Sequence, residues 1–156
     1  MDYVKILASA IFVMFVSLII YTAGSFVDME YYTNSDNFGL WSKIMMPNMG
    51  PPGVEFYFVS LVFKFIIGLI FTLFYMVIAK SIRQESILKT GIFYGCLLFV
   101  ILGIPTTLNT FLLFAVPLGL LISWTIQGLL VLVISGMGVV YIMRYTCKFN
   151  NAGSLR

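Results

Sequence analysis

The stretch VEFYFVSLVFKFIIGLIFTLFYMVIA, residues 54–79, is apolar apart from Glu55 at its start and Lys64. A helix of about 20 apolar residues crosses the roughly 30 Å hydrocarbon core of a bilayer, so this stretch is long enough to span a membrane. Three other stretches share its character: Val4–Val27, Thr90–Phe114 and Pro117–Met143. The 156 residues are 61% hydrophobic and 10% charged, and their mean hydropathy is +1.04. We therefore expect an all-α integral membrane bundle of four transmembrane helices, forming a single domain over residues 1–156.

The basic residues predict how this bundle is oriented. If the chain crosses the membrane four times, seven of the nine Lys and Arg fall on one side: Lys5, Lys80, Arg83, Lys89, Arg144, Lys148 and Arg156. Cytoplasmic loops carry the excess of Lys and Arg, so we expect the N and C termini to be cytoplasmic. The small size and the composition, rich in Phe, Ile, Met and Asn, favour a bacterial source and therefore the cytoplasmic (inner) membrane.

Residues 28–53 form the expected outer loop. Its first part is polar and turn-rich, and we expect Asp28 and Glu30 to be solvated there. Its middle part is bulky and apolar, and places Trp41 at the depth of the lipid head groups. Trp124 and Tyr57 are the other expected interface anchors, because Trp and Tyr collect at membrane–water boundaries.

Six polar residues are expected at one depth within the spans: Lys64, Thr106, Thr107, Asn109, Ser123 and Gln127. If Lys80 marks the inner boundary, about 20 residues at roughly 1.5 Å each put Lys64 only ~6 Å below the outer boundary. The functional interpretation is a pocket for a lipid head group or a small amphipathic ligand, with Lys64 attracting an anion. In the structural interpretation Lys64 snorkels to the surface, Asn109 caps a helix kinked at Pro105, and Gln127 bonds a neighbouring backbone.

Small residues indicate where helices approach each other closely. Gly91 and Gly95 form a G-x-x-x-G pattern, and Ser135 and Gly138 offer a second small surface. The sequence does not decide whether these residues pack within the bundle or against a partner.

The chain lacks the residues on which metal binding, thiol redox chemistry and common catalytic mechanisms depend. The chain has no histidine, and its two cysteines, Cys96 and Cys147, form no C-x-x-C pair. We therefore expect no metal site, no cofactor and no catalytic residue. The methionines Met45, Met46 and Met49 fit a Cu(I) site, but more readily an apolar face in the interface. The basic residues are scattered around span ends, which argues against a nucleic-acid site.

The second half of the chain resembles a loose group of small bacterial four-span membrane proteins of unknown function. The resemblance rests on the stretch from Gly95 to Gly103, on Ile104-Pro105 followed by Thr-Thr-Leu-Asn109, on Pro117-Leu118, on Ser123 to Gly128, and on Gly138 to Tyr141. It implies a four-span fold and carries no activity.

Two functions remain open from the sequence. The first is a non-enzymatic accessory or structural subunit, which packs against membrane lipids and other membrane proteins or copies of itself. The alternative is binding or transport of a lipid or a small hydrophobic or amphipathic molecule through the outer-leaflet polar pocket described above.

Overall fold

The computed structural model describes residues 3–46, 52–82 and 84–153, and all regular elements within these ranges are helices. They are α1 (Tyr3–Val27), α2 (Met29–Thr33), the 3-10 helix η1 (Ser35–Leu40), α3 (Val54–Ile78), α4 (Ile87–Leu98), the π-helix η3 (Phe99–Gly103), α5 (Ile104–Leu113) and α6 (Leu118–Gly153). Met49, Arg83 and Arg156 lie outside the described residues. Because α4, η3 and α5 run on as one helix, the described residues include four helices that are long and apolar enough to cross a membrane, which confirms the predicted all-α fold with four potential spans.

Local chemistry sets where the spans begin. Helix α3 begins at Val54, directly after Gly53. The third span begins at Ile87, three residues before the expected Thr90. Ser86 is extended, with φ −91° and ψ 133°, and its carbonyl accepts hydrogen bonds from the backbone N–H and the hydroxyl of Thr90, both at 3.0 Å. Polar residues therefore start this helix ahead of its apolar run.

Pro105 is accommodated by a widened helical turn. The backbone N–H of Ile104 donates to the carbonyl of Phe99, five residues back, and Pro105 lies in the first turn of α5. A proline inside a helix lacks an N–H and its ring collides with the carbonyl four residues earlier, and a π-turn changes that local geometry. The Thr107 hydroxyl, two residues after Pro105, pairs with the Thr125 hydroxyl of α6 at 3.1 Å.

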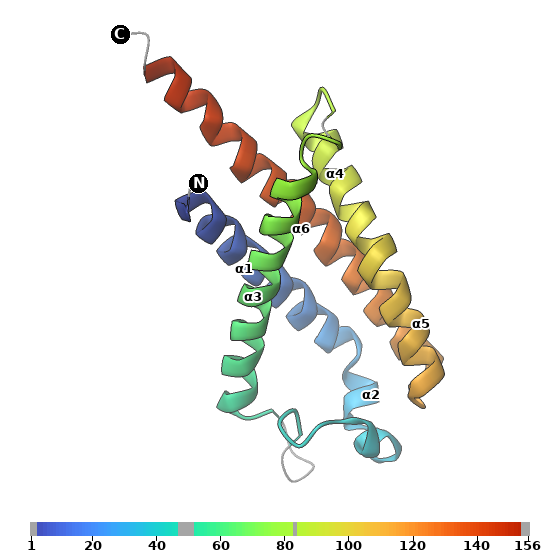
Figure 1. The fold of residues 1–156 in the computed structure, drawn as a ribbon. Coiled ribbons are helices and arrows are strands. Elements are labelled where there is room, and N and C mark those ends of the chain that lie inside the picture. The colour runs from blue at the N-terminus through green and yellow to red at the C-terminus, as the bar shows by residue number, and fades with distance from the viewer. Residues whose placement is uncertain (1–2, 47–51, 83, 154–156) are drawn as a thin grey trace.

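Helices α1 and α6 form the centre of the bundle (Figure 1). Helix α3 packs against α1, and α4 packs against α6 on the other side. The first and last helices start and finish at one end of the bundle, which we call the termini end. The opposite end carries α2 and η1, and we call it the loop end.

Small residues fix the helix crossings. A Cβ placed on Gly68 of α3 would lie 2.6 Å from the carbonyl oxygen of Ala10 in α1. A Cβ on Gly95 of α4 would lie 2.5 Å from the Cα of Val133 in α6. Backbones this close gain dispersion contacts, which drive helix association where no hydrophobic effect operates between helices.

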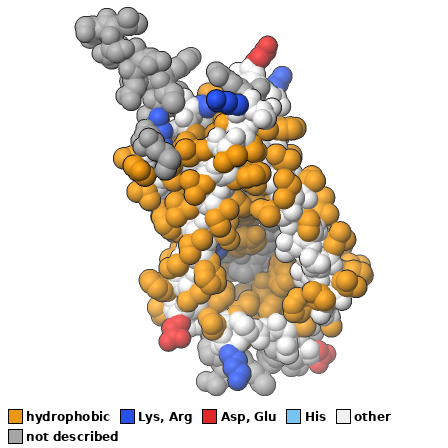
Figure 2. Space-filling model, viewed as in Figure 1, with side chains coloured by type: hydrophobic (Ala, Val, Ile, Leu, Met, Phe, Trp, Pro, Cys, Tyr) orange, Lys and Arg blue, Asp and Glu red, His pale blue; other side chains and the backbone are white. Residues whose placement is uncertain are grey.

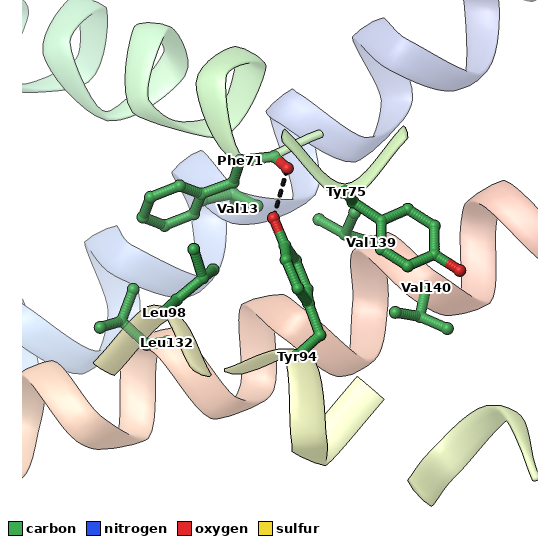
Figure 3. Packing of buried hydrophobic residues seen from close by; sticks show 8 residues of the cluster. All are labelled: Val13, Phe71, Tyr75, Tyr94, Leu98, Leu132, Val139 and Val140. Atoms are coloured by element: carbon green, nitrogen blue, oxygen red, sulfur yellow. Dashed lines mark hydrogen bonds between the residues drawn. The ribbon is translucent and has the colours of Figure 1, made fainter. Parts of the chain in front are cut away.

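The packed core lies in the middle of the bundle and toward its termini end. Figure 3 shows its buried side chains from close by. Tyr94 of α4 is fully buried there, and its hydroxyl donates to the carbonyl of Phe71 in α3 at 2.5 Å. Val13, Leu132 and Val139 surround this bond. The bond links α3 to α4, and the Tyr94 ring also contacts the rings of Phe74 and Tyr75 in α3.

Candidate ligand-binding site

A cavity of about 1290 Å³ opens in the loop half of the bundle. It lies between α1 and α3 on one side and η3, α5 and α6 on the other. Figure 2 shows this face hollowed near its middle, between two columns of apolar side chains. Ligand pockets usually measure roughly 300–1,000 Å³, so the space is ample for an amphipathic molecule with a chain.

Lys64 is the single charged side chain among the described residues that line the cavity. Its ammonium group lies over the ring of Tyr21, 5.7 Å from the ring centroid, so α1 and α3 meet here in a cation–π contact. Hydroxyl groups from α1, α3, α5 and α6 also line the cavity: Ser17, Thr22, Ser25, Tyr57, Ser60, Thr106, Thr107, Thr110 and Thr125. The lining thus combines one positive charge with many hydrogen-bonding groups.

The floor of the cavity is apolar. Phe71, Leu132 and Val131 are buried there and belong to both the lining and the packed interior of the bundle. Phe99 adds its ring from η3. The floor therefore offers hydrocarbon contact on the side away from the loop end.

A buried polar network lies beside the cavity and joins α6 to the end of α1. The side-chain nitrogen Nε2 of Gln127 donates to Oδ2 of Asp28 and to the hydroxyl of Ser123, each at 2.9 Å. A Cβ on Gly24 would lie 2.1 Å from the Gln127 side chain, so the absence of a side chain at Gly24 gives Gln127 its path to Asp28. Our expectation that Asp28 is solvated is wrong: it is 1% exposed.

Sequence reasoning missed this network because hydropathy assigns an aspartate at the end of a span to the solvent. Asp28 follows α1 directly, at the turn between α1 and α2, and its carboxylate accepts a hydrogen bond from Gln127 of α6. The signal that was present is the pairing of a small residue, Gly24, with an acid four residues later. That pattern becomes informative only once α1 and α6 are known to be neighbours.

An aromatic cluster covers the loop end of the cavity. The ring centroid of Trp41 lies 4.9 Å from that of Tyr32 and 6.0 Å from that of Trp124. The indole N–H of Trp124 donates to the Tyr32 hydroxyl at 3.3 Å. Burial raises the pKa of the Tyr32 phenol; the hydrogen bond from Trp124 lowers it and the negative charge of Asp28 raises it, for a net increase. Tyr32 is therefore a neutral phenol at physiological pH.

The structure brings together most of the six residues expected to form a pocket. Lys64, Thr106, Thr107 and Gln127 line the cavity. Ser123 lies behind Gln127 and accepts its hydrogen bond. Asn109 is exposed on α5 and is not part of the lining.

The remaining predicted residues also have definite places. Trp41 and Trp124 contact each other, and Tyr57 is 53% exposed near the start of α3. Gly91 and Gly95 face α6, Ser135 is fully buried, and a Cβ on Gly138 would collide with the Phe12 ring of α1. Met45 and Met46 line the loop end of the cavity.

The described part of the chain holds no group of three or more His, Cys, Asp or Glu side chains placed to hold a metal ion. No protein family, no curated protein and no solved structure matches this chain.

Proposed function

We propose that the protein binds a lipid or a small amphipathic molecule within the membrane, in the cavity between α1, α3, α5 and α6. The observation that carries this proposal is the cavity itself, about 1290 Å³ in volume, with hydroxyls and one lysine toward the loop end and an apolar floor. Binding sites between helices of a bundle typically pair an apolar wall with a few placed polar groups. An empty space of this size leaves its lining without contacts, and an occupant restores them.

Gly128 offers a way to fill the cavity without disturbing the helices. It lines the cavity, and a Cβ built on it meets nothing within 4 Å. The substitution Gly128→Leu therefore places a side chain in open space, and it also raises helix propensity by about 1 kcal/mol. We expect this variant to fold and to lose the bound molecule.

The measurement is native mass spectrometry of the protein extracted in a mild detergent, followed by chromatography of the released lipids. The wild type should retain a defined extra mass that Gly128→Leu lacks. Gly39→Leu is the matched control, because a Cβ on Gly39 also meets nothing within 4 Å but Gly39 does not line the cavity. Equal retention by Gly128→Leu and the wild type would remove the proposal.

A further inference from the structure

The positive charge of Lys64 has no negative counterpart in the cavity lining that the structure describes. Among the residues that the structure describes, the cavity lining contains no Asp or Glu, and Lys64 has no ion-pair partner. Asp28, the buried acid of the network beside the cavity, accepts its hydrogen bond from Gln127. A charge within a membrane-spanning segment is unfavourable unless another group compensates it, and such groups commonly mark ligand sites.

The cavity also has an open side. Helix α1 packs against both α3 and α6 and closes the back, whereas no comparable contact joins α3 to α5 within the described chain. Ile70 of α3 is 55% exposed and Leu102 of η3 is 43% exposed, and both line the cavity. Ile67 and Thr106 are likewise exposed and also line the cavity. These four residues form the two edges of a gap that faces the surroundings of the bundle, which in a membrane is lipid.

We propose that the occupant is a membrane lipid with a negatively charged head group, that it enters sideways between α3 and α5, and that Lys64 holds the head group. This inference rests on the proposed binding function. The hydroxyls of the cavity lining supply hydrogen bonds to head-group oxygens, and the floor at Phe71 and Leu132 receives part of the acyl chain. A zwitterionic lipid brings its own cation beside Lys64 and gains less from the site.

Tryptophan fluorescence tests the charge requirement. The variant Trp41→Phe leaves Trp124, which lines the cavity, as the remaining indole. The protein is placed in bilayers of phosphatidylcholine that contain brominated phosphatidylglycerol or brominated phosphatidylcholine, whose bromine atoms quench a nearby indole. We expect stronger quenching by the anionic lipid. Lys64→Met should weaken the apparent affinity for it about tenfold, since a charge-assisted contact shielded from water is among the stronger polar interactions.

Lys80→Met is the matched control, because Lys80 is an exposed lysine just after the other end of α3. Equal quenching by the two lipids, unchanged in Lys64→Met, would overturn the requirement for a negative head group while leaving a binding cavity in place. If neither brominated lipid quenches Trp124 more than random contact with the surrounding bilayer does, both proposals are overturned. Displacement of the brominated lipid by inorganic phosphate would show that the site takes a soluble anion and would overturn the membrane source.

The sideways route has its own test. The double substitution Ile67→Phe with Thr106→Phe narrows the gap from both edges, and we expect it to slow the onset of quenching after brominated lipid is added. Val77→Phe adds the same ring to an exposed position of α3 outside the cavity. An unchanged rate in the double variant would overturn the route between α3 and α5.

Discussion

At the scale of single residues, the carboxylate of Asp28 lies in an environment that its place at the end of an apolar run does not suggest. It is buried at the point where α1 gives way to α2, and its side-chain partner is an amide nitrogen rather than a cation. A buried acceptor that loses its donor suffers its full desolvation penalty, whereas removing both partners is much less harmful. Replacing Asp28 or Gln127 alone should therefore lower the stability of the protein more than replacing both residues together.

We expect Gln127→Ala to lower the free energy of unfolding by about 1–3 kcal/mol, because it strands the Asp28 carboxylate. Adding Asp28→Ala to that variant should recover part of the loss, since no buried acceptor then remains. Denaturant or thermal unfolding in detergent measures both effects. The chain's other glutamine, Gln84, has an exposed side chain, so Gln84→Ala is the control. If Gln127→Ala and Gln84→Ala are equally stable, the hydrogen bond between Asp28 and Gln127 contributes nothing to the free energy of unfolding.

At the scale of helices, three glycines determine how closely α4 approaches α6. A Cβ on Gly136 of α6 would lie 2.7 Å from the backbone nitrogen of Gly95, and one on Gly91 of α4 would lie 2.6 Å from the Cα of Met137. The atoms in the way are backbone atoms, which cannot turn aside as a side chain does. The close contact between α4 and α6 positions η3 and α5, which continue from α4 toward the loop end and form one wall of the cavity.

Gly95→Ala should therefore destabilise the bundle by about 1–3 kcal/mol through overpacking, despite the higher helix propensity of alanine. The position of the unfolding transition in detergent measures the loss. Gly128→Ala is the matched control on α6, because its new methyl group enters open space. A Gly95→Ala protein as stable as Gly128→Ala would mean that the two helices separate without penalty.

At the scale of the whole molecule, the bundle is tight at one end and open at the other. Tyr94 ties α3 to α4 near the termini end, and the cavity separates α3 from α5 near the loop end. We propose that the tight end faces the cytoplasm, on the strength of the Lys and Arg excess. Assembly with other membrane proteins stays a prediction. The exposed apolar side chains of the bundle fit contact with lipid as well as contact with a partner protein, so they do not distinguish the two.

Single cysteines test this orientation in a background that carries Cys96→Ser and Cys147→Ser. Asp36 lies at the loop end and Glu85 lies between α3 and α4, and both are exposed. We expect a membrane-impermeant maleimide to label Asp36→Cys in intact cells, and Glu85→Cys only after the cells are permeabilised. The reverse pattern would place both termini outside.

The apolar runs alone were enough to predict the four spans, because a bilayer requires every backbone group to be satisfied within its own segment, and a long apolar run achieves this as a helix. The sequence also indicated the shared depth of Lys64, Thr107 and Gln127, since rise per residue follows directly from helical geometry. The residues before the apolar runs were less predictable: Ser86 and Thr90 extended the third span by hydrogen bonding.

Which helices are neighbours could not be predicted from hydropathy and became known from the folded bundle. That choice depends on the rotation and tilt of each helix, which are set by close contacts such as Gly68 with Ala10 and not by hydropathy. Those contacts bring Gln127 to Asp28 and leave α3 apart from α5. Burial of a carboxylate and opening of a cavity both arise from these neighbours, so the physical basis of the proposed site lies in packing between helices.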